Sequence, residues 1–225
     1  MSDMVIAIDG PSASGKGALA RRIADVYGWS YFDSGLLYRA VAQYCLEGHI
    51  EPETVPPAEW PLIAQKISPL LDNADALREE HVGQMASRVA AISEVRTALL
   101  AFQRNLVTDL PPGVFLVMDG RDIGSVIFPQ AALKIFLTAS TETRALRRFH
   151  EMLQREDKDV LYETVLEDLK ERDARDQQRS TSPLKQAEGA VVIDNSLLTI
   201  EETVSQVREV IDTFLYPSPF KFLGR

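Results

Sequence analysis

The chain has few of the residues that mark secreted or metal-binding proteins. Its 225 residues include one cysteine, Cys45, so an internal disulfide is excluded, which fits a reducing cytoplasm. Cys45 stands in an apolar helical pattern and is expected in the core. The three histidines, His49, His81 and His150, lack metal-ligand spacing and are expected to be structural or surface residues.

Long apolar runs are missing as well. No run approaches the ~20 residues that a membrane-spanning helix needs. The apolar residues 5–8 are too few for the hydrophobic region of a signal peptide. We therefore expect a soluble, cytoplasmic protein that has no membrane partner.

Positive charge is scarce, since 24 Lys and Arg residues stand against 33 Asp and Glu residues, a formal net charge of −9. Such a chain is a poor general binder of nucleic acid, although local basic clusters can still hold a small anion. Hydrophobic residues make up 45% and charged residues 25%, which is ordinary for a globular protein. The length suits one compact domain, and a monomer is our default expectation.

Short β-rich apolar runs alternate with helical patterns along the chain. The expected strands are residues 4–9, 29–35 (ending in a turn), 114–118, 133–140 and 190–196. The expected helices are residues 16–28, 36–48, 58–71, 78–91, 93–107, 141–154, 159–179 and 199–215. This alternation predicts an α/β fold of three layers, with a central five-stranded parallel sheet covered by helices on both faces.

Two stretches interrupt the alternation. Residues 49–107 begin with a proline-rich connector, and residues 156–185 are highly charged and helical in pattern. We expect a single domain, residues 1–225, with a mainly helical acceptor-binding lobe at 49–107 and a helical lid at 156–185. The remaining core would comprise residues 1–48, 108–155 and 186–225.

The stretch "IDGPSASGKGALA" (residues 8–20) nearly spells a phosphate-binding loop, with Gly10, four residues, and then Gly15 and Lys16. It follows a predicted strand and opens a predicted helix, which is the required context. Glycines let successive backbone N–H groups ring a phosphate, and the helix and lysine add positive charge. The pattern predicts a nucleoside triphosphate site, and the residues expected around the phosphates are Gly10, Pro11, Ser12, Ala13, Ser14, Gly15, Lys16, Gly17 and Ala18.

The residue after Lys16 breaks the common pattern. In most P-loop proteins this position gives a hydroxyl to Mg²⁺, but here it is Gly17. A "GKG" loop resembles that of the nucleoside monophosphate kinases, in which the metal is held largely through water and phosphate oxygens. That family usually has Thr or Ser at the next position, whereas this chain has Ala18. The change removes one hydrogen bond to a phosphate, worth about 1–3 kcal/mol unless Ser12 or Ser14 compensates.

A kinase that acts on a nucleotide needs several arginines to neutralise two clusters of phosphate charge. Candidates lie in the blocks "FDSGLLYR" (32–39), "ASRVAAISEVR" (86–96), "DGRDIGSVIFP" (119–129) and "ERDARDQQR" (171–179). Together with the GKG loop, these blocks resemble the signatures of bacterial cytidylate kinases, in the same order and over most of the chain. The resemblance implies an enzyme that uses ATP and Mg²⁺ to phosphorylate CMP, and dCMP as well.

The resemblance also implies roles for single residues. Ser34, Arg39 and Arg121 would grip the acceptor monophosphate. Asp122 would accept a hydrogen bond from the exocyclic amine of cytosine, with Arg96 and Ser87 on the other edge of the base. Uracil offers a carbonyl where cytosine has its amine, so a carboxylate there discriminates between them. The expected acceptor-binding residues are Ser34, Tyr38, Arg39, Ser87, Arg96, Arg121, Asp122, Arg172, Asp176 and Arg179.

The block at 171–179 has two interpretations. Arg172, Asp176 and Arg179 have the spacing of one helix face. Spacing alone favours a solvated helix laced with ion pairs such as Asp168 with Arg172. The resemblance instead implies a mobile lid, with Arg172 and Asp176 near the ribose, Arg179 at the phosphates and Arg175 as a further candidate. The residues expected to stabilise the transfer are Lys16, Arg39, Arg121, Arg172 and Arg179.

Five more residues are weaker candidates. Asp33 and Asp119 end predicted strands, where they would either orient Mg²⁺-bound water or simply form turns; no side chain is predicted as a direct metal ligand. Arg144, Arg147 and Arg148 follow the fourth strand, and we expect one of them near the donor base, assigned to Arg148, with the others solvated.

Bacterial cytidylate kinases usually carry a small antiparallel β insert in the acceptor lobe, and residues 61–78 show no such pattern. This leaves lobe closure and the choice between ribose and deoxyribose open, and the tail at 216–225 is unassigned. The alternatives are another small-molecule P-loop kinase, acting on UMP and CMP, AMP or shikimate, and a module that binds nucleotide without using it. The latter would usually show an Asn/Thr-Lys-x-Asp motif, which is missing.

Overall fold

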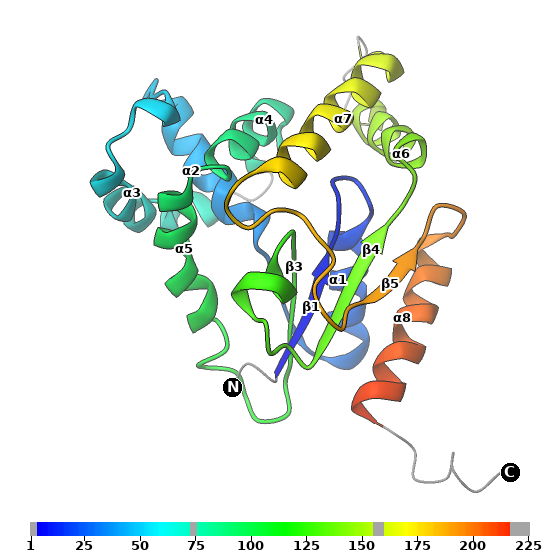
Figure 1. The fold of residues 1–225 in the computed structure, drawn as a ribbon. Coiled ribbons are helices and arrows are strands. Elements are labelled where there is room, and N and C mark those ends of the chain that lie inside the picture. The colour runs from blue at the N-terminus through cyan, green and yellow to red at the C-terminus, as the bar shows by residue number, and fades with distance from the viewer. Residues whose placement is uncertain (1–3, 73–75, 155–159, 217–225) are drawn as a thin grey trace, which may run out of the picture.

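The computed structural model describes residues 4–72, 76–154 and 160–216. Its sheet has five strands in the order β2-β3-β1-β4-β5, and every pairing is parallel (Figure 1). The strands are β1 (Val5–Asp9), β2 (Ser30–Asp33), β3 (Leu116–Gly120), β4 (Leu133–Thr138) and β5 (Val191–Asp194). The predicted sheet is confirmed, although β3 begins and ends two residues later than the predicted 114–118.

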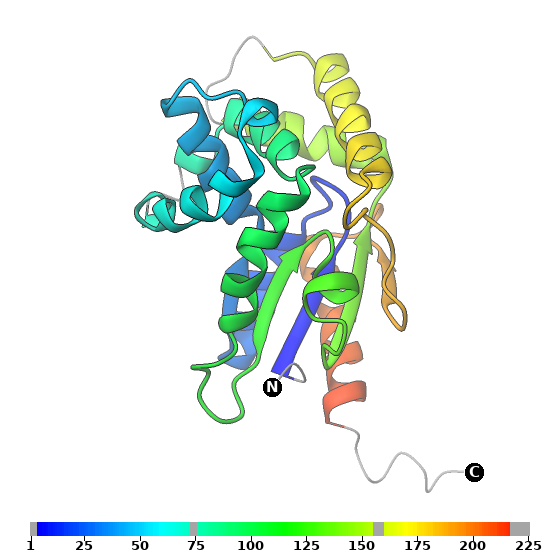
Figure 2. The same ribbon diagram turned by 60° about the vertical axis from the view of Figure 1, so that its left-hand side comes forward.

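Helices cover both faces, because the strands bury side chains on both. Ile6 and Ile8 of β1 point to the face covered by α1 (Lys16–Tyr27) and α8 (Ile200–Leu215). Val5 and Ala7 point to the other face, which is covered by α5 (Ser93–Asn105) and a short π-helical turn, Ile123–Ile127. The three predicted layers are therefore present (Figure 2).

The segment predicted to be the acceptor-binding lobe has an apolar core that it shares with the helix before it. This core forms among α2 (Gly35–Glu47), α3 (Trp60–Lys66), α4 (Glu80–Val89) and α5, and it contains the buried Cys45 as predicted. The described residues of 49–107 hold helices and turns and no strand. The single helix predicted at 58–71 is wrong: α3 is flanked by 3₁₀ turns, Pro57–Glu59 and Ser68–Asp72. The proline at 69 lacks the N–H that a continuing helix would need.

The segment predicted to be the lid contains one long helix, α7 (Tyr162–Gln178), which packs against α6 (Thr141–Gln154) of the core above the strand ends (Figure 1). Ala145, Val165 and Leu169 form a small apolar cluster between them, and Ala13 of the phosphate loop packs against it. The lid is therefore in contact with the loop. The start of the helix predicted from 159 falls partly outside the described residues.

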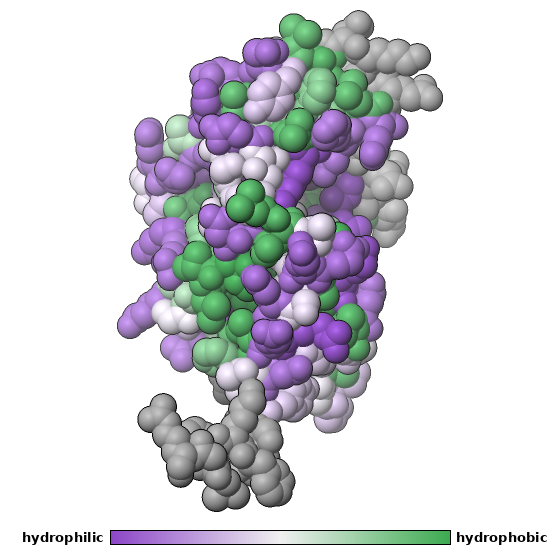
Figure 3. Space-filling view, turned by 90° about the vertical axis from the view of Figure 1, so that its right-hand side faces the viewer, coloured by the Kyte–Doolittle hydropathy of each residue, from purple (hydrophilic) through white to green (hydrophobic). Residues whose placement is uncertain are grey.

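The molecular surface mixes polar and apolar side chains. On the side seen in Figure 3, hydrophobic residues gather near the middle of the face and again toward its top, with hydrophilic residues among and around them. Val192 of the edge strand β5 and Leu197 beyond it are exposed. Among the described residues, none of the helices has the length and apolar character required to cross a bilayer. Residues 217–225 of the predicted loose tail lie outside the described part of the chain.

Candidate active site

The phosphate loop joins β1 to α1, and its backbone explains its glycines. Gly10 has φ 150°, and a Cβ there would lie 1.9 Å from the carbonyl oxygen of Leu137. Gly15, the N-cap of α1, has φ 89°. Both values favour glycine, because other residues rarely adopt them. The loop thus directs its backbone around the N-terminus of α1, where an anion binds well.

Lys16 lies folded over this loop. Its side chain is buried, and its Nζ donates a hydrogen bond to the Pro11 carbonyl oxygen at 2.6 Å. Burial and the neighbouring Arg121 lower the pKa of Lys16 to about 7. A phosphate group bound in the loop would place a negative charge beside Lys16 and stabilise its protonated form.

Gly17, which lacks the usual hydroxyl, lies close to the side chains of Tyr31 and Asp119. A Cβ on Gly17 would lie 3.5 Å from the hydroxyl of Tyr31 and 3.8 Å from Oδ2 of Asp119. The Tyr31 hydroxyl donates to Oδ1 of Asp119 at 2.9 Å. Burial and the nearby Asp33 raise the pKa of Asp119 to about 7. A hydroxyl and a buried carboxylate therefore stand beside the position where other P-loops carry their hydroxyl.

Asp33, the other candidate for orienting metal-bound water, has structural partners. Its Oδ1 accepts the N–H of Gly35 at 3.0 Å, which is the turn-forming role, and its Oδ2 pairs with Arg78 at 3.0 Å. Within the described residues, no group of three His, Cys, Asp or Glu side chains could hold a metal ion. The oxygen atoms beside the loop suit Mg²⁺, which commonly keeps water and substrate phosphates as ligands.

A pocket beyond the loop brings together every residue predicted for the acceptor. It lies between the ends of β2 and β3, the lobe helices α2, α4 and α5, and the lid helix α7. Its lining includes Ser34, Tyr38, Arg39, Ser87, Arg96, Arg121, Asp122, Arg172, Asp176 and Arg179. These residues come from four separate sequence blocks, so the pocket exists only in the folded chain.

One end of this pocket carries a buried ion pair. Arg96 and Asp122 form a salt bridge, and Arg96 also lies over the ring of Tyr38 with its guanidinium carbon 5.1 Å from the centroid. Within the described residues, Ser87 Oγ and Arg96 Nε are buried and have no hydrogen-bond partner. Buried polar groups are normally paired, so these donors are suited to a ligand.

The other end of the pocket contains several arginines, whose positive charges repel one another. Arg39 donates to the Leu77 carbonyl oxygen at 2.7 Å, and burial and the nearby Arg172 lower its pKa to about 10. Burial and the nearby Arg121 lower the pKa of Arg172. Arg121 itself donates to Oδ2 of Asp176 at 2.8 Å. Such a group of cations is stabilised by an anion, and a phosphate is a good match.

Two lid residues are placed more finely than the sequence allowed. Arg179, expected at the phosphates, lines the acceptor pocket, with Arg96 and Asp122 among its charged neighbours, and donates to the Ser182 carbonyl oxygen at 2.6 Å. Arg175 donates to Gln84 of α4 at 3.2 Å. The lid thus contacts the acceptor lobe directly.

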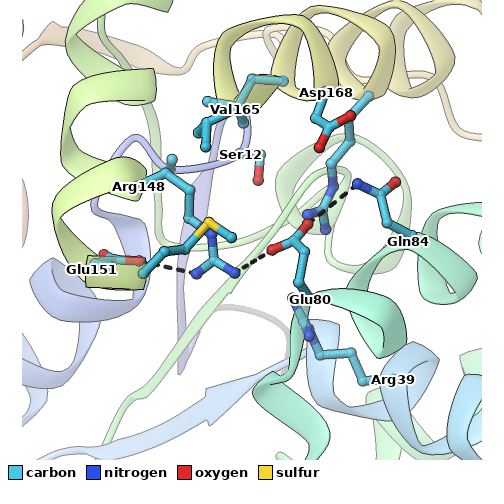
Figure 4. Close-up of a pocket in the computed structure, with 12 residues that line it drawn as sticks. Ser12, Arg39, Glu80, Gln84, Arg148, Glu151, Val165 and Asp168 are labelled. Atoms are coloured by element: carbon cyan, nitrogen blue, oxygen red, sulfur yellow. Dashed lines mark hydrogen bonds and ion pairs between the residues drawn. The ribbon is translucent and has the colours of Figure 1, made fainter. Parts of the chain in front are cut away.

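A second cavity, of about 180 Å³, lies between the loop, α4, α6 and α7 (Figure 4). Arg148 enters it from α6 and pairs with Glu80 of α4 and, at 3.1 Å, with Glu151. Arg39 and Arg172 line this cavity as well as the acceptor pocket, so the two spaces meet at these arginines. Ser12 lines the loop side of the cavity.

The prediction that Arg144 and Arg147 are solvated is wrong for Arg144. Its side chain is buried, pairs with Asp173 of the lid at 2.7 Å and donates to the Ser12 carbonyl oxygen at 3.2 Å. Arg147 is half-buried and donates to Asn195 Oδ1 at 3.0 Å. Helical spacing does not reveal such partners, because each is distant in the sequence.

The sheet is parallel, a glycine-rich loop follows its first strand, and a pocket lined by arginines lies between the strand ends and α7. These are the features of a P-loop kinase. A solved structure of an uncharacterized protein from Eubacterium ventriosum shares this fold, with a TM-score of 0.51 and 15% identity over 93% of this chain and 99% of that one. The profile of the family described as cytidylate kinase matches residues 6–213. The chain belongs to the cytidylate kinase family, as the sequence blocks predicted.

Curated relatives agree with this family. A cytidylate kinase of Paramagnetospirillum magneticum is 45% identical over 92% of this chain and 97% of its own length. One of Xanthobacter autotrophicus is 46% identical, covering 93% and 97%. The predictions of family, fold class and enzyme class, a nucleoside monophosphate kinase, are thereby confirmed.

Proposed function

We propose that this protein transfers the γ-phosphoryl group of ATP to CMP, and to dCMP, releasing ADP and the nucleoside diphosphate. The proposal is supported above all by the buried pair of Arg96 and Asp122 at one end of the acceptor pocket. Asp122 accepts from the exocyclic amine of cytosine, while Ser87 Oγ and Arg96 Nε, which have no partner among the described residues, donate to the ring nitrogen and carbonyl of the base. Uracil would set its carbonyl oxygen against the carboxylate.

The arginines hold the phosphate of the acceptor. Arg39 and Arg121, with the Ser34 hydroxyl nearby, bind its oxygens, and Arg172 lies at the junction between this pocket and the loop cavity. The acceptor is already an anion, so no dedicated general base is required. One of its oxygens forms the new bond to the γ-phosphorus as the bond to the β-phosphate oxygen of ATP breaks, and no covalent enzyme intermediate is implied.

The loop holds the donor. Its backbone N–H groups and Lys16 bind the ATP phosphates, and Lys16 stabilises the charge that develops during transfer. Mg²⁺ would be held by phosphate oxygens and by water oriented by Asp119, and it would neutralise phosphate charge. The lid at 156–185 and the lobe at 49–107 exclude water from the reacting phosphates, with Arg172 and Arg179 contributed by the lid.

The alternatives have less support. Curated relatives named cytidylate kinase favour neither shikimate phosphorylation nor nucleotide binding without catalysis. The uracil of UMP would set a carbonyl oxygen against the Asp122 carboxylate, and the two-ring adenine of AMP is larger than the cytosine for which the pocket is proposed. We further propose that the enzyme acts as a cytoplasmic monomer on small nucleotides, without nucleic acid or membrane partners.

The proposal is tested by the rate of ADP release from ATP and Mg²⁺, with CMP, dCMP, UMP and AMP offered separately. We expect turnover to be dominated by CMP and dCMP. Equal or faster turnover with UMP or AMP would contradict the base-pocket assignment. ATP binding with no turnover of any acceptor would favour the nucleotide-binding module.

A further inference from the structure

A buried carboxylate links the phosphate loop to the segment that reads the acceptor base. Asp9 is the last residue of β1, directly before Gly10, and is 3% exposed. Its Oδ1 accepts the backbone N–H of Ile123 and its Oδ2 that of Gly124, both at 2.8 Å. These are the first residues of the π-helical turn that follows Asp122, and the turn lies against β1 (Figure 2).

These two hydrogen bonds answer a local need of the chain. The first N–H groups of any helical turn lack partners within it and cost free energy when they are buried unpaired. The Asp122 side chain makes no cap hydrogen bond at this turn. Asp9 reaches across from the neighbouring strand and accepts both N–H groups, so Asp122 keeps its carboxylate for Arg96.

The packing around the segment leaves it little freedom. A Cβ on Gly124 would lie 3.1 Å from the side chain of Lys134 and 3.4 Å from Cβ of Ala7. A Cβ on Gly120, just before Arg121, would lie 2.5 Å from the hydroxyl of Ser34. The chain from 120 to 124 is therefore packed closely at both ends, and two of its N–H groups are held by the Asp9 side chain.

We propose that Asp9 is a positioning residue of the acceptor site: by holding the Ile123 and Gly124 amides, it fixes Asp122 and thereby the choice of base. This inference rests on the proposed CMP kinase function. Asp9 itself would touch neither substrate, since it lines neither the acceptor pocket nor the cavities beside the phosphate loop. The residue that directly precedes the phosphate loop, which binds ATP, would then control which base is accepted at the acceptor site.

The state of the carboxylate agrees with this role. Burial raises the pKa of Asp9 to about 6, while the two N–H groups act against that rise. At pH 7.5 the ionised form therefore prevails, and both of its oxygens can accept. Asparagine in its place would offer one acceptor oxygen and turn its NH₂ group toward the second N–H.

Asp9→Asn tests the inference against Asp109→Asn, an exposed control that removes the same charge. In Asp9→Asn we expect KM for CMP to rise about tenfold and the CMP-to-UMP ratio of kcat/KM to fall about tenfold, because one charge-assisted hydrogen bond is lost. We expect KM for ATP to stay within about twofold. The control should match the wild type in all three.

Two results would overturn the inference: an unchanged CMP-to-UMP ratio, or an equal rise in KM for ATP and CMP, which would place the effect in the loop or the whole fold. Failure of the wild type to prefer CMP would instead count against the proposed function alone. Amide hydrogen exchange then tests the contact without any activity. In Asp9→Asn we expect the amides of Ile123 and Gly124 to exchange faster than in the wild type, while the amides of β4 exchange at the wild-type rate. Unchanged protection of Ile123 and Gly124 would contradict the positioning role.

If Asp9→Asn does not fold, Asp9→Glu serves in its place. It keeps both acceptor oxygens but is longer by one methylene, which displaces the turn from β1. The same fall in the CMP-to-UMP ratio is expected. A ratio equal to that of the wild type would contradict the inference.

Discussion

Asp122→Asn removes the negative charge that faces Arg96 in the acceptor pocket. Both side chains are buried, at 5% and 7% exposure, so the guanidinium loses its charged partner away from water. Breaking a buried pair by removing one partner costs about 3–5 kcal/mol. Arg96 keeps the Ala90 carbonyl oxygen at 3.2 Å and the Tyr38 ring, so we expect a loss of about 3 kcal/mol in the free energy of unfolding. That corresponds to a midpoint lower by about 6–12 °C.

The same substitution should alter the choice of base. The exocyclic amine of CMP loses a charged acceptor, a hydrogen bond worth about 1.5–3 kcal/mol, so kcat/KM for CMP should fall by about 10–150-fold. Asparagine can turn its NH₂ group toward the carbonyl of uracil, so kcat/KM for UMP should hold or rise. Initial rates over a range of each acceptor, together with thermal unfolding, measure both effects.

Asp109→Asn controls for the loss of one carboxylate, since Asp109 is exposed in a loop. An Asp122→Asn enzyme that is less stable yet keeps the wild-type CMP-to-UMP ratio of kcat/KM would contradict a role of Asp122 in base selection. In that case the pair with Arg96 would be purely structural, and the base would be read elsewhere.

Three further changes test separate parts of the site. At pH 8, ATP binding should take up about one proton, because the phosphates restore the charge of Lys16, whose pKa is lowered to about 7; calorimetry in buffers of different ionisation enthalpy measures this. Gly10→Ala would place a carbon 1.9 Å from the Leu137 carbonyl oxygen, so ATP affinity should fall at least about tenfold in fluorescence titrations. Arg144→Met leaves Asp173 buried without its partner, so urea titrations should show a loss of about 3–5 kcal/mol.

Each of the three has a matched control. Lys16→Met should abolish the proton uptake, and an uptake that persists would assign it to another group. Gly113→Ala shares a positive φ, 80°, but meets open space, so it should leave ATP affinity unchanged. Arg22 is exposed, and Arg22→Met should cost less than about 1 kcal/mol; an equal loss for both arginine variants would contradict the importance of the buried pair.

The sheet and the loop could be predicted from the sequence because their signals are local. Val5 to Asp9 is a buried strand, and the spacing of Gly10, Gly15 and Lys16 reflects backbone needs within a few residues. The residues that we propose to bind the acceptor could be named only through the resemblance to a family. Spacing alone favoured a solvated lid helix, yet Asp176 is buried against Arg121, which is 55 residues away.

The contacts that could not be predicted join distant parts of the chain. The pairs of Arg144 with Asp173 and of Tyr31 with Asp119 depend on how the layers pack, which helical and strand periodicity do not record. From the sequence, Asp9 could be recognised only as the last residue of the first strand. Its contact with the turn at 123–127 was missed because a short π-helical turn leaves no periodic pattern in the sequence.

Competition between two acceptors in one tube measures whether this enzyme phosphorylates CMP in preference to UMP. Equal amounts of CMP and UMP are mixed with the protein, Mg²⁺ and limiting ATP, and the diphosphates are separated and counted while little ATP has been consumed. Their ratio reports the ratio of the two kcat/KM values. We expect CDP to be formed in large excess over UDP, and equal amounts of the two would show that the enzyme has no preference for CMP.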